Sequence, residues 1–254
     1  MQQRTRAMVL NTAIDLMDWD TAVHRLVTKG QARQSAVVCI CNVHMTVTAN
    51  RHPALAHVLK HADMVTPDGA PVAWVLRRAG YRDQQRINGP DLMWRYLAQA
   101  ERLGQIVSFY GGTEATMDRL LAAMLHTFPM LKLGCMVIPP FRTLTVDEDL
   151  DYANRINRSG TNVLFVGLGC PKQEVWMGEH RGIVHAAMVG VGAAFDYHAG
   201  TIKRAPLWMQ NSGLEWLHRL FAEPRRLWRR YLVTNTLFIT GMAKTGFKAS
   251  RMDD

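Results

Sequence analysis

The chain has 254 residues, of which 48% are hydrophobic and 20% charged, and it carries a net charge of +9. This length suits one substantial domain, or one domain with an appendage, and the composition excludes disordered and collagen-like chains. The chain has no run of about 18 uncharged apolar residues, and its first residues lack the apolar core of a secretion signal. We therefore expect a cytoplasmic protein without a membrane-spanning helix.

Short apolar runs alternate with longer segments of helical period. The apolar runs predict buried strands at Ala36–Cys41, Met64–Thr66, Ile106–Tyr110, Leu133–Ile138, Asn162–Val166 and Ala186–Val191. The longer segments predict helices at Pro53–His61, Ala70–Arg78, Pro90–Leu103, Glu114–Thr127, Thr145–Arg158 and Pro171–His180. This alternation predicts an α/β fold of Rossmann-like type, with a mainly parallel sheet and helices on both faces.

The pattern changes after Asp196. We expect a Rossmann-like domain over residues 1–202 and a basic, helical C-terminal appendage over residues 203–254. The appendage holds 10 basic and 4 acidic residues, whereas the preceding 202 residues hold 20 and 17. A local excess of positive charge indicates a local anionic partner, which is a nucleic acid, an anionic membrane surface or a phosphorylated ligand.

A helix beginning at Arg225 would be strongly amphipathic. One face would carry four arginines, Arg225, Arg226, Arg229 and Arg230. The opposite face would carry four apolar residues, Leu227, Trp228, Tyr231 and Leu232. This pattern fits a solvated face above a stripe packed on the core, and it equally fits a helix that lies on an anionic membrane.

Four loops at predicted strand ends are rich in glycine or proline, and they span Thr66–Gly69, Tyr110–Thr113, Gly167–Gln173 and Gly190–Gly192. Glycine at such a position lets a phosphate group approach the backbone, which makes a substrate-binding set of Gly111, Gly112, Gly167 and Gly169. In any single loop a steric reason for glycine is the commoner one. The dinucleotide fingerprint G-x-G-x-x-G is incomplete, because Lys172 replaces its third glycine.

Polar residues close to these loops are candidates for chemistry. Asp68 is either the N-cap of the following helix or a base that takes a proton from a hydroxyl. Asn42 ends the first strong strand, and His44 shares its side of that strand, where it either contacts substrate or has the structural role that is commoner for a lone histidine. Arg86 is suited to binding a diphosphate, and Asp196 is either a cap or a second acid.

Taken together, these stretches resemble the WecG/TagA/CpsF family of bacterial glycosyltransferases. The similar segments are Cys41–Met45, Thr66–Gly69, Arg86–Met93, Phe109–Gly112, Val166–Glu174, Phe195–Gly200, Arg204–Pro206, Gly213–Leu220, Glu223–Leu227 and Arg229–Tyr231. They run in order through about four fifths of the chain and are specific as a set.

The resemblance implies an inverting, metal-independent enzyme without a cofactor, which moves a sugar from a UDP-sugar to a polyprenyl-diphosphate-linked saccharide in surface or exopolysaccharide biosynthesis. It implies that Asp68 is the catalytic base and that Asn42, Arg86 and Gln173 line the substrate pocket. It also implies that the basic C-terminal segment meets the lipid diphosphate at the inner face of the cell membrane. Some relatives carry threonine at the position of Ile40, so the donor sugar stays open between glucose and N-acetylmannosamine.

The residues agree with the resemblance, because arginine or backbone N–H groups can take up the charge of a leaving UDP in place of a metal ion. The alternative is a nucleotide- or nucleic-acid-binding protein that uses its basic tail. Against it, basic and aromatic residues are not interleaved over a sheet surface, and we expect no nucleic-acid partner. The oligomeric state stays open, with a homo-oligomer as one option.

Overall fold

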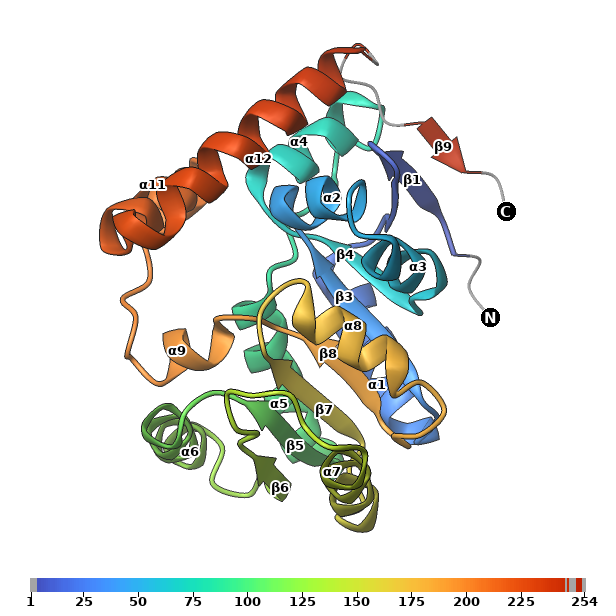
Figure 1. Ribbon diagram of the computed structural model, residues 1–254, viewed down its shortest axis with the longest axis vertical. Helices are drawn as coiled ribbons and strands as arrows, with labels where there is room; N and C mark the ends of the chain where they lie inside the picture. The colour runs from blue at the N-terminus through green and yellow to red at the C-terminus, as the bar shows by residue number, and fades with distance from the viewer. Residues whose placement is uncertain (1–3, 245, 247–249, 253–254) are drawn as a thin grey trace. The chain divides into compact units, whose positions relative to one another are not determined.

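The structure is a computed structural model, and it describes residues 4–244, 246 and 250–252 (Figure 1). The strands are β1 (Arg6–Val9), β2 (Thr12–Asp15), β3 (Ala36–Cys41), β4 (Met64–Pro67), β5 (Ile106–Gly111), β6 (Lys132–Val137), β7 (Val163–Gly167), β8 (Ala187–Gly190) and β9 (Ser250–Met252). The helices are α1 (Trp19–Ala32), α2 (Val43–Ala49), α3 (Pro53–His61), α4 (Ala70–Arg78), α5 (Gly89–Leu103), α6 (Glu114–Thr127), α7 (Val146–Arg158), α8 (Lys172–Glu179), α9 (Ala194–His198), α10 (Leu207–Asn211), α11 (Glu215–Ala222) and α12 (Pro224–Lys244).

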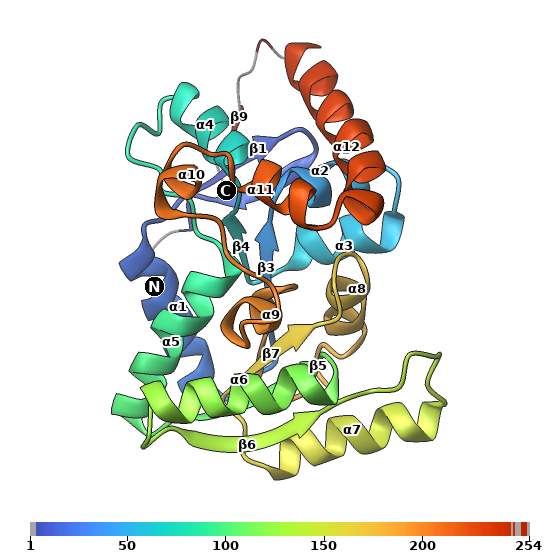
Figure 2. The same cartoon turned by 90° about the vertical axis from the view of Figure 1, so that its left-hand side faces the viewer.

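The main sheet has six strands in the order β4-β3-β8-β7-β5-β6. The pairs β3–β8, β7–β8, β5–β7 and β5–β6 are all parallel. Figure 2 shows α1 and α5 on one side of strands β5, β7 and β8, and α7 and α8 on the other. The predicted α/β fold of Rossmann-like type is therefore confirmed, and the predicted strands and helices occur within two residues of the expected positions.

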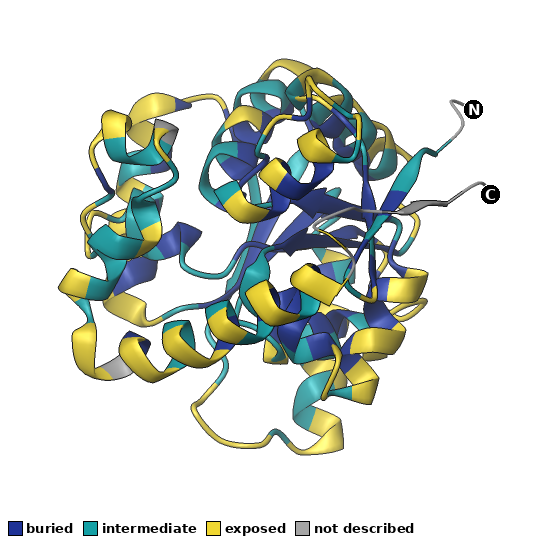
Figure 3. Cartoon of the chain, turned by 90° about the horizontal axis from the view of Figure 1, so that it is seen from above, coloured by how far each residue is buried: buried dark blue, intermediate teal, exposed yellow. Residues whose placement is uncertain are grey.

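The central strands of the main sheet are completely buried. All six residues of β3 and all four residues of β8 are buried, and Figure 3 shows these strands in dark blue. Strands covered by helices on both faces cannot alternate apolar and polar residues, which is why they read as continuous apolar runs. Burying each Val, Leu or Phe contributes roughly 1.5–3 kcal/mol, so the strands anchor the loops that follow them.

The chain divides into two compact units. The first unit contains residues 1–18, 40–88 and 203–254, and the second contains residues 19–39 and 89–202. The second unit holds β5 to β8 and most of β3. The first unit holds the other strands, the two last residues of β3, and helices α2–α4 and α10–α12. Residues 203–254 thus group with residues near the ends of β3 and β4.

The first unit contains a small antiparallel sheet with the order β2-β1-β9. Asp15, at the end of β2, has a fully buried carboxylate that forms an ion pair with Arg4 and accepts the N–H of Val65 at 2.6 Å. The contact with Val65 ties this sheet to the start of β4. None of the helices in the described part of the chain has the length and apolar character needed to span a bilayer.

Candidate active site

Two sequence-predicted residues meet at the ends of neighbouring strands of the first unit. The N–H of Asp68, directly after β4, donates to the carbonyl of Cys41, the last residue of β3, at 2.8 Å. A Cβ placed on Gly69 would lie 3.8 Å from Cβ of Asn42. Asn42 and the Asp68–Gly69 pair therefore lie side by side, as ligand-binding residues of parallel sheets commonly do.

The structure excludes the N-cap alternative for Asp68. The N-cap of α4 is Gly69, which adopts a φ of 81° and makes no side-chain cap. Oδ1 of Asp68 instead accepts the N–H of Gly69 at 2.6 Å and Nε of Arg86 at 3.3 Å. The carboxylate is thus held by its own loop and by a cation 18 residues away in the sequence.

Burial raises the pKa of the Asp68 carboxyl above its ordinary value. The nearby charge of Arg86 opposes this shift, whereas the negative charge of Glu215 adds to it. The Asp68 side chain nevertheless keeps 18% of its surface exposed. A carboxylate with increased proton affinity that a substrate can still reach has the properties of a general base.

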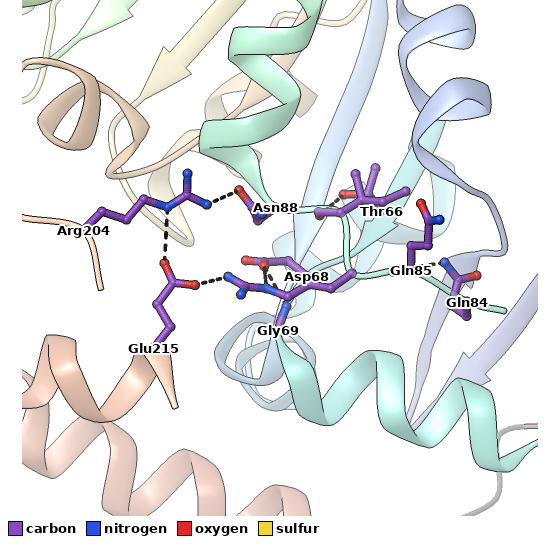
Figure 4. Close-up of polar contacts among 10 residues, drawn as sticks. Thr66, Asp68, Gly69, Gln84, Gln85, Asn88, Arg204 and Glu215 are labelled. Carbon is purple, nitrogen blue, oxygen red and sulfur yellow. Dashed lines mark hydrogen bonds and ion pairs between the residues drawn. The ribbon is translucent and has the colours of Figure 1, made fainter. Parts of the chain in front are cut away.

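Arg86 connects Asp68 to the C-terminal segment of the same unit. Its Nη2 donates to Oε2 of Glu215, the first residue of α11. Nε of Arg204 lies 4.0 Å from Oε1 of Glu215, and Nη2 of Arg204 donates to Oδ1 of Asn88 at 3.5 Å. Figure 4 shows Asp68, Asn88, Arg204 and Glu215 turned toward one another.

The roles of Arg204, Glu215 and Asn88 were not predicted from the residues. They stand within the segments that carry the family resemblance, but no spacing rule marks them as partners of Arg86. Arg86 and Glu215 are 129 positions apart in the sequence, and only the folded chain brings them together. In the sequence, the two partners of this ion pair look like any other surface Glu and Arg.

His44 was placed on a strand by the sequence, and this was wrong. Asn42 is the N-cap of α2, where its Oδ1 accepts the N–H of Met45 at 3.1 Å, and His44 lies in the first turn of that helix. The β-branched segment Val43–Ala49 reads as a strand, but the Asn42 cap starts a helix there. Burial, followed by the charge of Arg230 on α12, lowers the pKa of His44 to about 4. Its imidazole is therefore neutral at neutral pH.

In the second unit, Gln173 joins two of the glycine loops. Its Oε1 accepts the N–H groups of Gly169 and Gly192, each at 3.1 Å, and its Nε2 donates to Oε1 of Glu174 at 2.7 Å. Gln173 is 3% exposed. In this arrangement its amide holds the loops together, and the N–H groups of Gly169 and Gly192 are already bound.

Glu174 is a buried carboxyl that sequence reasoning did not single out. Its residue is fully buried, and its Oε2 has no hydrogen-bond partner among the described residues. Burial raises its pKa to about 7, against an ordinary value of 4.5. A carboxyl of this kind stays protonated over much of the acidic range, which fits a buried site without a cation beside it.

The four glycines of the predicted substrate-binding set differ in why glycine is required. A Cβ on Gly111 would lie 2.6 Å from the carbonyl oxygen of Gly167, and one on Gly167 would lie 2.5 Å from the ring of Phe195. Close packing therefore requires glycine at these two positions. Gly112 and Gly169 have φ values of 77° and 79°, and a Cβ on Gly169 would meet nothing within 4 Å. Of the four glycines, Gly169 is the one with open space around it.

Asp196 lies in α9 of the second unit, between Phe195 and Tyr197. Its Oδ1 accepts hydroxyl groups from Thr201 at 3.2 Å and Thr116 at 3.4 Å. The carboxylate thus fastens the end of α9 to its own following loop and to α6. Among the described residues no group of three or more His, Cys, Asp or Glu side chains is arranged to hold a metal ion.

The C-terminal helix α12 begins where the sequence predicts, but its buried face differs from the predicted one. Leu227 is buried, whereas Trp228 and Leu232 are 48% and 63% exposed. The buried stripe continues instead through Thr234, Phe238 and Met242, because α12 packs on α2 and α11. The outward face of the helix therefore carries apolar side chains as well as arginine.

The four predicted arginines of α12 occupy distinct environments. Arg225 and Arg229 are exposed, and the guanidinium of Arg229 lies 5.1 Å from the centre of the Trp228 ring. Arg230 is half-buried, with its guanidinium 5.4 Å from the Tyr231 ring. The Arg226 side chain lies outside the described part of the structure. Exposed arginine beside exposed Trp228 is the combination favoured at the headgroup region of a membrane.

Comparison with known proteins matches the sequence to a family. The sequence model of the family described as "Glycosyl transferase WecG/TagA/CpsF family" matches residues 7–252. The chain is 31% identical, over 200 residues, to an N-acetylglucosaminyldiphosphoundecaprenol N-acetyl-beta-D-mannosaminyltransferase of Bacillus spizizenii. The alignment covers 78% of this chain and 76% of that relative.

Proposed function

The chain belongs to the WecG/TagA/CpsF family of glycosyl transferases, and we propose that it transfers a sugar from a UDP-sugar to a polyprenyl-diphosphate-linked saccharide with inversion at the anomeric carbon. The observation that carries this proposal is the half-buried Asp68–Arg86 pair, in which Asp68 directly follows β4 beside the end of β3. The relative from Bacillus spizizenii is named for transferring N-acetylmannosamine to N-acetylglucosaminyldiphosphoundecaprenol.

In the proposed reaction, Asp68 removes the proton from the attacking hydroxyl of the acceptor. The hydroxyl oxygen forms the new bond to the anomeric carbon while the bond from that carbon to the UDP oxygen breaks. A sugar hydroxyl is a poor nucleophile, and a positioned base accelerates such a step by roughly 10²–10⁴. The increased proton affinity of Asp68 supports this role, because a stronger base abstracts the proton more readily.

The departing UDP carries negative charge away from the sugar. We propose that the guanidinium of Arg86 takes up this charge in place of a divalent cation. For the second unit we keep the prediction that its glycine loops bind substrate, and a Cβ on Gly169 would meet nothing within 4 Å. Gln173 then acts mainly by holding the loop conformation, since its own amide is engaged by Gly169, Gly192 and Glu174.

The C-terminal segment of residues 203–254 is proposed to bring the enzyme to its lipid-linked acceptor. Exposed apolar side chains cluster on its helices, namely Leu207, Trp208, Phe221, Trp228, Leu232 and Ile239. Exposed arginines on α12 stand among them, and anionic lipid attracts each arginine near its surface by about 1 kcal/mol. These features support peripheral association with the inner face of the cell membrane.

The donor sugar and the reaction are tested by one assay. The purified protein is incubated with undecaprenyl-diphosphate-linked N-acetylglucosamine as the acceptor. Parallel reactions contain UDP-glucose, UDP-N-acetylmannosamine or UDP-N-acetylglucosamine as the donor, and the masses of the lipid products are measured by mass spectrometry. We expect one added hexose or N-acetylhexosamine from one of the first two donors, in the inverted anomeric configuration. No transfer from any UDP-sugar, together with salt-dependent DNA binding, would favour the nucleic-acid-binding alternative.

A further inference from the structure

We infer that Glu215 is a positioning residue, which holds Arg86 through Nη2 so that Nη1 of the guanidinium stays available to an oxyanion. The inference deepens the proposed glycosyl transfer and rests on it. It assigns a role in the site to a residue of the C-terminal segment that does not itself touch the reacting atoms.

The geometry at Arg86 carries the inference. Nε donates to Asp68 and Nη2 donates to Glu215, so two of the three guanidinium nitrogens bind carboxylates. Nη1 has no protein partner within the part of the chain that the structure describes. Guanidinium N–H groups bind phosphate oxygens, and Nη1 is available to take such an oxygen.

Glu215 also limits how closely Arg86 can approach Asp68. The Arg86–Asp68 contact is 3.3 Å, which is long for a charge-assisted hydrogen bond, whereas the Arg86–Glu215 contact is short. A guanidinium released from Glu215 would be able to turn and bind Asp68 with two hydrogen bonds. That pairing would stabilise the charged form of Asp68 and occupy the carboxylate that has to accept a proton.

Burial strengthens the electrostatic interactions among these charged side chains. Side chains of Asp68, Arg86 and Glu215 keep only 18%, 22% and 16% of their surfaces exposed, so water screens them weakly. Arg204, the next cation, stands 4.0 Å from Glu215 on the side away from Asp68. The four side chains therefore alternate in sign and sum to zero, an arrangement in which each charge is compensated.

The charged groups facing Asp68 are Arg86 and Glu215, and their effects on its pKa are opposite. Removing the negative charge of Glu215 takes away one contribution that raises the pKa of Asp68, and it frees Arg86, which lowers that pKa. Both consequences act in the same direction. The pKa of Asp68 should therefore fall when Glu215 is replaced by a neutral residue.

The test compares Glu215→Gln with Glu223→Gln. Glu223 lies in the same C-terminal segment and 3.9 Å from Arg219, so its replacement removes one equal charge outside the Asp68 cluster. We expect Glu215→Gln to reduce kcat up to about a hundredfold, because a misplaced catalytic group can cost that much, with a smaller change in KM. The acidic limb of the pH profile of kcat/KM should move to lower pH, and Glu223→Gln should leave both unchanged.

A second measurement does not depend on activity. The carboxyl carbon of Asp68 is titrated by ¹³C NMR in the wild-type protein, in Glu215→Gln and in Glu215→Asp. We expect the pKa of Asp68 to fall in Glu215→Gln and to return toward the wild-type value in Glu215→Asp, which restores the charge. If folded Glu215→Gln keeps the wild-type pKa and turnover, the inference is overturned. A wild-type protein that transfers no sugar, while the pKa still falls in Glu215→Gln, would contradict the proposed function alone.

Discussion

Nε of Arg86 lies 3.3 Å from Oδ1 of Asp68, and this ion pair joins the loop after β4 to the segment that leads into α5. Either residue alone has an ordinary explanation, as a helix cap or as a surface charge. Together they place a base with raised proton affinity beside a cation whose Nη1 has no partner among the described residues. The predictions below test what this pair, its neighbours and the C-terminal helix do.

Transfer should proceed in the presence of excess EDTA. We propose that Arg86 takes up the charge on the departing UDP, which is the role that Mg²⁺ or Mn²⁺ fills in metal-dependent transferases. The measurement is the initial rate of sugar transfer with and without the chelator. Loss of transfer in EDTA, followed by recovery on adding Mg²⁺ or Mn²⁺, would show that a metal ion is required.

His44 should remain neutral across the physiological pH range. Burial and the charge of Arg230 disfavour its protonated form and place its pKa at about 4. In an NMR titration its ring resonances should not move between pH 8 and pH 6. Arg230→Gln should raise the pKa of His44 because it removes the nearby positive charge. Titration of wild-type His44 near pH 6.5 would place it in a solvated environment.

Glu174 should make the protein less stable as the pH rises. Its pKa is about 7 in the folded chain and about 4.5 when it is unfolded, so the folded state holds the extra proton between these values. The free energy of unfolding should therefore fall from pH 4.5 to pH 7, by an amount on the order of 3 kcal/mol.

The comparison for Glu174 is the variant Glu174→Gln, in which an amide can still accept the Nε2–H of Gln173. Denaturant unfolding at pH 5 and pH 8 should give a smaller difference between the two pH values in Glu174→Gln than in the wild type. Equal pH dependence in both proteins would mean that the carboxyl is not held protonated. Asp15, buried in an ion pair with Arg4, is untouched by this change.

The outward face of α12 should bind anionic membranes. Replacing Arg225 and Arg229 with Glu removes two exposed cations, each worth about 1 kcal/mol near anionic lipid, and should weaken vesicle binding at least about thirtyfold. The control is the same change at Arg102 and Arg119, two exposed arginines of the second unit. Sedimentation with vesicles of anionic and of zwitterionic lipid measures the binding.

Unchanged binding of the Arg225→Glu, Arg229→Glu protein to anionic vesicles would assign these arginines to an ordinary solvated surface. Replacing Trp228 and Leu232 with Ser tests the apolar contribution separately, because both side chains are exposed in the structure. The isolated loss of transfer to lipid-linked acceptors, with transfer to a short soluble acceptor retained, would locate the effect at the membrane.

The buried strands were predictable because the residues within each strand are enough to mark it. β3 and β8 are buried throughout, since helices cover both faces. The short N-terminal strands β1 and β2 were not predicted, because four residues of mixed character carry too little periodicity. The helix α1 was missed for a similar reason, as its buried positions include the small residues Ala22 and Gly30.

The candidate site was only partly predictable. The loop position of Asp68 after β4 could be read from Thr66–Gly69, and Arg86 stood close to it in the sequence. The contribution of Glu215 could not be read, because it depends on how the C-terminal segment folds back within the first unit. His44 was misplaced because the Asn42 cap outweighs the strand preference of the residues that follow.

The turnover of Asp68→Asn tests the central claim most directly. Asparagine has nearly the shape of aspartate and can still accept hydrogen bonds from Gly69 and Arg86, but it cannot take a proton from the acceptor hydroxyl. We predict that Asp68→Asn folds, binds UDP like the wild type and loses turnover by roughly 10²–10⁴ in the transfer assay with the lipid-linked acceptor. Turnover close to that of the wild type in a folded Asp68→Asn protein would contradict the assignment of Asp68 as the base.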